Sequence, residues 1–390
     1  MNILYLTANF PYPLTSGYLR HYFLIRELAQ QHEITLLSLV GATFDAANIE
    51  ALTPYTKRIM TVTSQTRGGS RRRKAINRLR SVVSQDSAIV QMRGIVEQLL
   101  RSERYDAIIL SGKQTYFAVR GLPLPPLVAD MCDATSMKIR GHMRYASPVK
   151  RLLLWWDWQQ MRGIETKIIR SAQHLLFASA RDCDVMMGGL AQPAAVIPNG
   201  VDLDYWKRST SSRDAHTIIF TGAMNYAPNS DAALYLMRDI FPRVQQVVPD
   251  AKLLIVGHSP TPEVLQAGQR PGIQVTGFVD DMRPYLEQAR VFAAPLRFGA
   301  GIQNKLLEAM ALELAVVASP LAGEGLRTRS GESPPLTTAD SADEFARAIV
   351  HELCTPASVA SSEREYVQRH FSWPRGAAQL NEILLQIAKS

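Results

Sequence analysis

The densest group of residues able to do chemistry lies in RFGAGIQNKLLEAMA, Arg297 to Ala311. Gly299 and Gly301 allow the backbone to approach a ligand closely. They lead directly into an apolar pattern of helical spacing that begins near Ile302 to Asn304. The first amides of such a helix are free to bind phosphate or sugar hydroxyls. The stretch therefore predicts a binding site built on backbone, with Gln303 inside it.

Two charged side chains follow in the same stretch. Lys305 supplies a positive charge suited to a diphosphate, and Glu308 lies one helical turn further on. A carboxylate does not bind phosphate, but it can accept hydrogen bonds from the two hydroxyls of a ribose. The combination predicts a nucleotide-sugar site. The alternative is a surface Lys–Glu pair that stabilises the helix by about 0.2–0.5 kcal/mol. The glycine and lysine spacing of the phosphate-binding loop of nucleoside triphosphatases is absent.

Two other loops join an expected strand to an expected helix. The first contains Gly17, and a helix N-terminus there favours an anion, although an ordinary turn fits as well. The second, FTGAMNYAPNSDA, places Gly222, Asn225 and Tyr226 after a strand, where they can bond a phosphate or a sugar. The alternative for this second loop is helix capping by Asn229, Ser230 or Asp231.

The elements that must position these loops alternate between strands and helices. In the first half, strands are expected at 2–8, 33–40, 107–110, 127–130 and 174–179, with a long helix over 149–170. In the second half, strands are expected at 217–222, 251–257, 273–279, 291–296 and 315–319. Residues 204–216 are polar and turn-rich, as at a domain edge. The pattern predicts an α/β protein of two doubly wound Rossmann-like domains facing a cleft, which is the default ligand site.

Charge and composition limit the classes of partner. The chain has 390 residues and a net charge of +8. Residues 1–175 hold 24 basic against 12 acidic residues, and the densest patch is Arg67 to Arg80. No aromatic residues are interleaved there for base stacking, so a membrane or an anionic lipid-linked substrate is expected rather than nucleic acid. A solvated basic loop is the plainer alternative.

Further features bear on membranes and redox state. No apolar run approaches the length that spans a bilayer, and the start of the chain does not read as a signal peptide. Three dispersed cysteines favour reduced thiols in a cytoplasmic protein. VKRLLLWWDWQQMR combines Trp155, Trp156 and Trp158 with basic residues, which suits a membrane interface, but packing of these rings in the core is favoured.

The motifs resemble those of bacterial family 4 glycosyltransferases of the GT-B fold. The resemblance rests on GAGIQNKLLEAMA, VTGFVDDMRPYLEQARVFAAPLR, VIPNGVDLDYW, PYPLTSGYLRHYFLIRELA and FSWPRGAAQLNEIL, and it covers nearly the whole chain. The form GxGIxNKxLEAMA is similar to that of sugar transferases associated with exopolysaccharide and exosortase-type systems.

The resemblance implies retaining transfer of a hexose from a nucleotide-sugar, with a UDP- or GDP-sugar as co-substrate and no cofactor. Glu308 matches the second glutamate of the family's E-x7-E motif, which bonds the ribose, whereas Ala300 stands in place of the first. The family's basic residues after the first C-domain strand are replaced by Asn225 and Tyr226, so Lys305 and Arg297 become the candidates for neutralising phosphate.

The remaining site residues implied by the resemblance lie on both domains. Gly277 and Phe278 fall where the family's backbone meets the nucleobase, and Gly17 matches one glycine of the first loop. On the acceptor side we expect Arg20, which we predict to point into the cleft, together with Asp133 and His142. Asp133 is expected to give acceptor contact or acid–base help, or else to be a structural cap. DLD at 202–204 and the pair Asp280 and Asp281 are interpreted as turn residues, so no metal is expected.

The expected domains are 1–195 for the acceptor, 196–370 for the nucleotide-sugar, and a helix over 371–390 that packs back on the first domain. The acceptor is expected to be a glycan or a lipid-linked molecule in envelope or exopolysaccharide biosynthesis. The protein is expected in the cytoplasm, with peripheral contact to the inner face of the plasma membrane. Three alternatives stay open: a nucleotide-sugar epimerase of the same architecture, a non-catalytic nucleotide-sugar-binding assembly subunit, and a nucleic-acid binder.

Overall fold

The computed structural model describes residues 1–14, 19–64, 87–143, 147–209, 214–299, 302–328, 331–355 and 362–389. Gly17, Gly301, Ala300 and the basic patch at 67–80 therefore lie outside the described residues, as does the side chain of His142. The chain forms two compact units. Unit 1 comprises Met1–Pro198 and Trp373–Ser390, and unit 2 comprises Asn199–Ser372.

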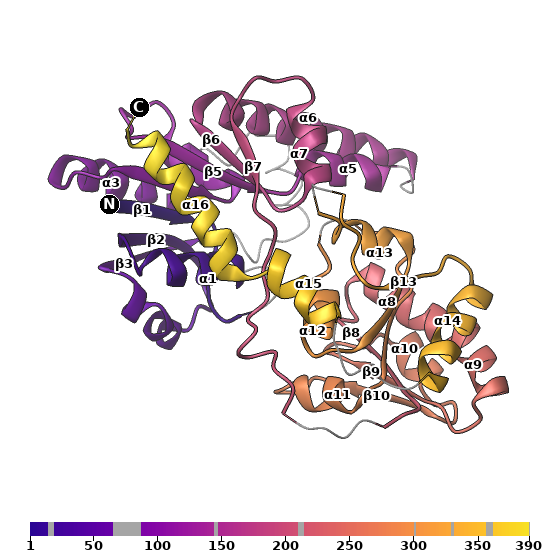
Figure 1. Ribbon diagram of the computed structural model, residues 1–390. Coiled ribbons are helices and arrows are strands. Elements are labelled where there is room, and N and C mark those ends of the chain that lie inside the picture. Colours follow the sequence, from indigo (N-terminus) through magenta and orange to yellow (C-terminus); the bar gives the residue numbers. More distant parts are fainter. Residues whose placement is uncertain are drawn as a thin grey trace. The chain divides into compact units, whose positions relative to one another are not determined.

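Unit 1 is built on a seven-stranded parallel sheet (Figure 1). The strand order is β3-β2-β1-β4-β5-β6-β7, so the order reverses between β1 and β4. At such a reversal the crossover connections lie on opposite faces, and the carboxyl ends of the two strands open a crevice. The strands are β1 Asn2–Thr7, β2 Glu33–Gly41, β3 Arg58–Ser64, β4 Ala107–Ser111, β5 Leu127–Cys132, β6 His174–Phe177 and β7 Ala194–Val196.

Helices cover both faces of this sheet. Successive side chains of a strand point to opposite faces, so Ile3 and Tyr5 of β1 join one core, and Leu4 and Leu6 join the other. The first core also takes in residues of the first helix and the last helix of the chain, which pack together. The helices of unit 1 are α1 Leu19–Leu28, α3 Ser87–Ser102, α4 Tyr116–Val119, α5 Thr135–Met143, α6 Pro148–Ser171, α7 Ala180–Met187 and α16 Trp373–Ile387.

Unit 2 contains a six-stranded parallel sheet in the order β10-β9-β8-β11-β12-β13. Its strands are β8 Thr217–Thr221, β9 Lys252–Val256, β10 Ile273–Gly277, β11 Val291–Ala294, β12 Ala315–Ala318 and β13 Thr337–Thr338. Its helices are α8 Ala227–Tyr235, a π-helical turn Leu236–Ile240, α9 Phe241–Val247, α10 Pro262–Ala267, α11 Arg283–Gln288, α12 Asn304–Ala311, α13 Pro320–Glu324, α14 Ala342–Cys354 and α15 Ser362–His370. The doubly wound α/β fold class expected from the alternating pattern is confirmed in both units.

The tryptophan-rich helix differs from its expected role. Trp155 and Trp156 of α6 are 42% and 45% exposed, so the prediction that these rings pack in the core is wrong. The reason is the length of α6: its buried residues are Glu165, Ile168 and Ile169, all in its last third. The first half of the helix therefore contributes no buried side chain to the core. No helix in the described part of the chain is long and apolar enough to cross a bilayer.

Candidate donor and acceptor sites

The candidate site of unit 2 lies at the carboxyl edge of its sheet. Because the strands are parallel, the segments that follow β8, β9, β10 and β11 all emerge at this edge. Gly222, which follows β8, packs tightly against Gly257, which follows β9. A Cβ on Gly257 would lie 1.9 Å from the Gly222 carbonyl oxygen, so no side chain fits there. The edge is thus formed by closely packed backbone.

Gly222, Asn229 and Lys305 meet at this edge. A Cβ on Gly222 would lie 2.6 Å from Asn229 Nδ2 and 3.1 Å from Lys305 Nζ. Lys305 Nζ donates a hydrogen bond to Asn229 Oδ1 at 2.5 Å and lies 4.7 Å from the centroid of the Phe220 ring. The absence of a side chain at Gly222 therefore leaves the lysine ammonium beside bare backbone, where a ligand can approach it.

The role of Asn229 corrects the capping interpretation. Helix α8 begins at Ala227, two residues earlier than its polar run suggests, with Tyr226 at the N-cap position and no side-chain capping bond. Asn229 is buried, its Nδ2 donates to the Ala223 carbonyl, and its Oδ1 receives Lys305. Pro228 at the start of the helix sets this earlier beginning, since proline favours the first turn.

Burial shifts the pKa values of both charged residues of α12. It lowers the pKa of Lys305 to about 8, although the nearby Glu308 carboxylate opposes the shift. It raises the pKa of Glu308 to about 7, against the attraction of Lys305. Both groups are therefore poorly solvated, and an anion placed beside Lys305 would compensate its charge better than the surrounding protein does.

The start of α12 is fixed by its neighbours. Gln303 is the N-cap residue, with no side-chain capping bond, so the first amides of the helix are not satisfied by a cap. Asn304 Oδ1 accepts a hydrogen bond from Asn199 Nδ2 at 3.2 Å. Ile302 packs against the core of unit 2. The expected helix start near Ile302 to Asn304 agrees with the observed start at Asn304.

Arg297 is less suited to a phosphate than Lys305. Its guanidinium forms a two-point ion pair with Asp231, with Nη2 to Oδ1 at 2.5 Å, and lies 4.8 Å from the Tyr235 ring. Its charge is therefore already compensated within unit 2.

The other predicted donor residues are open at the same edge. Tyr226 is 56% exposed and Phe278 is 73% exposed, and Asn225 is also exposed. Gly277 has a φ of +73°, a backbone conformation that favours glycine. These residues can receive a flat ring or a sugar without displacing core packing.

Arg20 of unit 1 does not have the predicted position. It is 4% exposed, its Nε donates to Asp130 Oδ2 at 2.7 Å, and its Nη1 donates to the Ile197 carbonyl at 2.8 Å. The expectation that Arg20 points into a cleft is therefore corrected: a buried carboxylate at the end of β5 holds it. Burial acts to raise the pKa of Asp130, but Arg20, His21 and the hydrogen bonds that the carboxylate accepts together outweigh it, so the pKa lies below its usual value.

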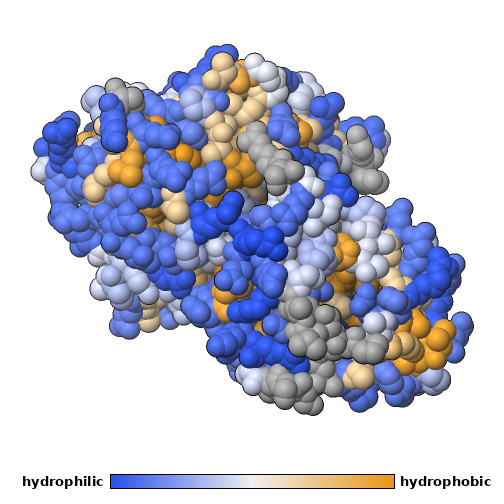
Figure 2. Space-filling view, viewed as in Figure 1, coloured by the Kyte–Doolittle hydropathy of each residue, from blue (hydrophilic) through white to orange (hydrophobic). Residues whose placement is uncertain are grey.

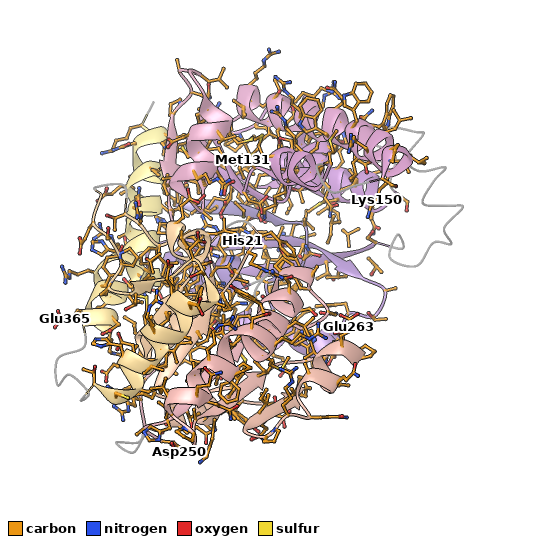
Figure 3. All side chains as sticks on the ribbon, turned by 90° about the vertical axis from the view of Figure 1, so that its right-hand side faces the viewer. His21, Met131, Lys150, Asp250, Glu263 and Glu365 are labelled. Atoms are coloured by element: carbon orange, nitrogen blue, oxygen red, sulfur yellow. The ribbon has the colours of Figure 1, made fainter. Side chains whose placement is uncertain are left out.

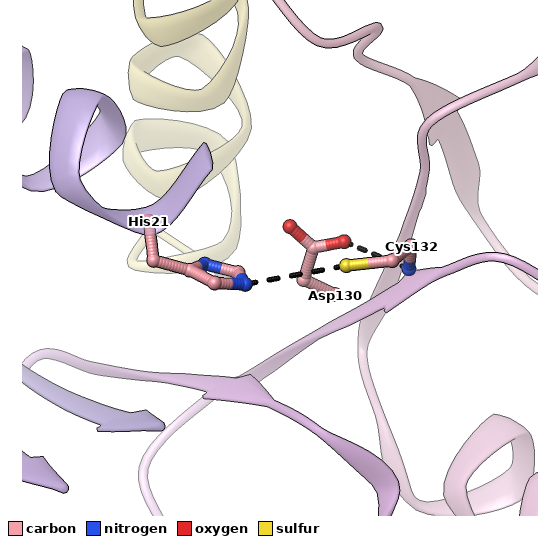
Figure 4. Close-up of side chains that lie close together, drawn as sticks. All are labelled: His21, Asp130 and Cys132. Carbon is pink, nitrogen blue, oxygen red and sulfur yellow. Dashed lines mark hydrogen bonds between the residues drawn. The ribbon is translucent and has the colours of Figure 1, made fainter. Parts of the chain in front are cut away.

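Further buried polar side chains lie beside this ion pair, and Figure 4 draws His21, Asp130 and Cys132 of this group. His21 contacts Tyr5 Oη through Nδ1 at 2.9 Å and Ser111 Oγ through Nε2 at 2.5 Å, and Cys132 Sγ lies 4.0 Å from Nε2. Burial lowers the pKa of His21 to about 4, so its imidazole is neutral. His21 was not predicted from sequence, where it appears as one of several polar residues in an amphipathic helix.

His21, Asp130 and Cys132 are the one group in the described residues with metal-ligand types close together. They do not fit a metal ion well. Asp130 is engaged by Arg20 and by the Cys132 amide, both ring nitrogens of His21 have partners, and burial raises the pKa of the Cys132 thiol. The group is a structural network beneath the carboxyl ends of β1, β4 and β5.

Asp133 lies just beyond this network, in a set of charges. Lys138 Nζ contacts its Oδ2 at 2.6 Å, Lys113 Nζ lies 3.8 Å from Oδ1, and Thr135 donates to Oδ1 at 2.9 Å. Burial acts to raise the pKa of Asp133, but Lys138 and Lys113 lower it. A carboxylate so compensated is a weak base, which favours a contact or structural role over proton transfer.

The remaining aspartates engage in local structure. Asp202 Oδ1 accepts from the amides of Asp204 and Tyr205, and Asp281 binds the backbone and guanidinium of Arg283. Both contacts are those of turns and helix starts. Sequence reasoning missed Phe220 and Gly257; the signal for each was its place at the end of a strand, in TIIFTG and KLLIVG.

Comparisons with known proteins bear on both units. Residues 215–354 match the family described as glycosyl transferases group 1. Phosphatidyl-myo-inositol mannosyltransferase of Mycobacterium tuberculosis is 32% identical over 218 residues, which cover 52% of this chain and 57% of that protein. An uncharacterized 44.6 kDa protein in the cps region of Klebsiella pneumoniae is 23% identical over 67% of this chain and 69% of its own. The chain thus spans little more than half the length of the mannosyltransferase.

Solved structures extend the likeness to the whole fold. Anabaena HepE, solved with UDP and glucose, is 16% identical with a TM-score of 0.68, covering 99% of this chain and all of the other. Sucrose-phosphate synthase of Thermosynechococcus elongatus is 17% identical with a TM-score of 0.72 over the full length of both chains. The chain therefore has the GT-B fold that its motifs predicted, and its residues 215–354 match the family of group 1 glycosyl transferases.

Proposed function

We propose that the protein transfers a hexose from a nucleoside-diphosphate sugar to a glycan or lipid-linked acceptor, with retention of the anomeric configuration. The observation that carries this proposal is the placement of Lys305. Its ammonium is desolvated, lies beside glycine backbone at the end of β8, and donates a hydrogen bond to the neutral Asn229 amide. A diphosphate is the ligand that best satisfies a cation in this setting.

Each residue of the site then has a specific task. Lys305 and the first amides of α12 stabilise the negative charge that develops on the leaving diphosphate. Glu308, one turn along α12, accepts hydrogen bonds from the ribose hydroxyls. Gly277 and the exposed Phe278 receive the base, and Asn225 and Tyr226 contact the sugar or its phosphate.

Several finer statements belong to the same proposal. The charge on the leaving group is neutralised by Lys305 rather than by a metal ion. Asp133, held by two lysines, contacts the acceptor and does not act as the base. The donor is a UDP- or GDP-sugar, and the acceptor belongs to envelope or exopolysaccharide synthesis, as in the subgroup whose GxGIxNKxLEAMA form this chain is similar to.

Calorimetric titration with UDP, GDP and ADP, with and without EDTA, is the first test. We expect one diphosphate to bind tightly and EDTA to leave its affinity unchanged. The matching sugar nucleotide is then incubated with lipid-linked and free glycan acceptors. Product whose anomeric configuration is that of the donor supports the proposal.

Other outcomes separate the alternatives. Isomerised sugar nucleotide in the absence of acceptor would identify an epimerase. Donor binding without transfer or hydrolysis would identify a binding subunit. This alternative is considered because Ala300 stands in place of the family's first glutamate. Loss of binding on EDTA treatment would overturn the metal-free mechanism.

A further inference from the structure

The first half of α6 carries an apolar face that unit 1 does not cover. Val149, Leu152, Leu153 and Trp156 follow the spacing i, i+3, i+4 and i+7, which places them on one side of the helix. They are 76%, 68%, 43% and 45% exposed, and Trp155 beside them is 42% exposed. We call these five residues the α6 face. Five of the seventeen large apolar side chains exposed in the described chain therefore lie within eight residues.

The clustering of these apolar side chains indicates an interaction surface. Single apolar side chains on a surface are ordinary, but a contiguous apolar patch marks an interaction site. Figure 2 shows one side of the molecule, where most of the surface is hydrophilic and apolar side chains gather in small groups. The buried residues of α6 are confined to its last third, so core packing does not explain the apolar residues of its first half.

Charge decides which partner fits. Helices α5 and α6, which pack together, carry seven basic described residues (Lys138, Arg140, Lys150, Arg151, Arg162, Lys167 and Arg170) and two acidic ones (Asp157 and Glu165). Lys150 lies in the first turn of α6, next in sequence to Val149 of the α6 face (Figure 3). A twofold contact between copies of this chain would bring these positive surfaces together, which electrostatic repulsion disfavours.

Tryptophan, leucine and basic residues on one helix fit a phospholipid interface. Indole rings sit at the level of the headgroups, aliphatic side chains enter the acyl boundary, and lysine and arginine contact the phosphates. We infer that the first half of α6 binds the surface of an anionic phospholipid bilayer, with the α6 face inserted and the surrounding basic residues on the headgroup phosphates. The inference does not depend on the donor site, because binding to vesicles requires no nucleotide.

The test is co-sedimentation of the full chain with phosphatidylcholine vesicles and with vesicles that also contain phosphatidylglycerol. We expect binding to the anionic vesicles, weakened by salt, together with a blue shift of tryptophan emission. The double variant Leu152→Ser and Trp156→Ser should lose vesicle binding without loss of thermal stability, since both side chains are exposed. Lys150→Gln should weaken binding about fivefold, because each basic residue near an anionic surface contributes about 1 kcal/mol.

The matched control is the double variant Val247→Ser and Leu265→Ser in unit 2, where the side chains are 64% and 49% exposed. It should bind vesicles as the unaltered protein does. Absence of vesicle binding at low salt would overturn the inference. Unchanged binding by the α6 variant would also overturn it, and would assign the lipid contact to another basic segment. A dimer that becomes a monomer in the α6 variant would show that a second copy covers the face.

Discussion

At the scale of single residues, Lys305 is the position where function and stability oppose each other. Its pKa is lowered to about 8 by burial, so the folded protein holds the charged form at a cost. We expect Lys305→Met to reduce affinity for the nucleoside diphosphate at least about tenfold, because a charge-assisted contact of about 1.5–3 kcal/mol is lost. The same variant should melt at an equal or higher temperature.

The control for this variant is Lys252→Met, which removes an exposed lysine paired with Asp214 in the same unit. Calorimetry should find its diphosphate affinity unchanged. If Lys305→Met bound the diphosphate normally, the lysine would have no part in holding phosphate.

The two shifted pKa values also predict how affinity depends on pH. Lys305 is charged below about pH 8 and binds an anion there, so affinity should fall as the pH rises through 8. Glu308 is ionised above about pH 7 and accepts ribose hydroxyls in that form, so affinity should also fall as the pH drops through 7. Titrations from pH 6 to 9 should give a bell-shaped curve, and Glu308→Gln should flatten only its acidic limb. A profile without either limb contradicts the assignment.

Gly222 is the third residue whose type the site requires. In Gly222→Ala the new methyl group would lie 2.6 Å from Asn229 Nδ2, so Asn229 and the Lys305 ammonium bonded to it must move. We expect donor affinity to fall about tenfold or more, the effect of losing about 1.4 kcal/mol. Gly163→Ala is the control, because a Cβ at that position in α6 meets nothing within 4 Å. Equal affinity in the two variants would show that the space above Gly222 is not used.

At the scale of secondary-structure elements, the Arg20–Asp130 pair joins α1 to the end of β5 and to the segment at Ile197. Asp130→Asn would leave a buried guanidinium without its counter-charge, which costs about 3–5 kcal/mol. Chemical denaturation should measure this loss. Adding Arg20→Met to the Asp130→Asn background should recover most of it. If the free energy of unfolding fell by less than about 1 kcal/mol, the size expected for an exposed pair, the Arg20–Asp130 pair would not stabilise the contact between α1 and β5.

The elements also show what sequence can predict. Strands such as β1, β4 and β9 were predictable because they are continuous apolar runs between turn residues. The edge strands β3, β7 and β13 could not be predicted in this way, because they are partly exposed and two of them are very short. Arg20 looked like a cleft residue because nothing near it in sequence reveals that its partner is 110 residues away. The places of Lys305 and Glu308 on the first turns of α12 were predictable because a glycine-rich turn followed by an apolar helical pattern marks a helix start locally. Their binding roles stay a prediction.

At the scale of the whole molecule, unit 1 is completed by the far end of the chain (Figure 1). Helix α16 packs against α1, and Trp373 stacks on Phe23 with ring centroids 5.0 Å apart. Trp373, Leu380 and Leu384 are at most 1% exposed. Burying side chains of this size contributes about 1.5–3 kcal/mol each, and together they approach the stability of a typical domain.

A chain that stops at Ser372 should therefore lose the folded state of unit 1 while unit 2 still folds. Differential scanning calorimetry should show the transition of unit 2 without that of unit 1, and limited proteolysis should degrade residues before Pro198 first. A chain that stops at Ile387 keeps all of α16 and should melt as the full chain does. Since the proposed diphosphate contacts of Lys305 and α12 belong to unit 2, the Ser372 truncation should retain diphosphate affinity while losing transfer, because it lacks a folded unit 1. Retention of both transitions by that truncation would mean that α16 is dispensable to unit 1.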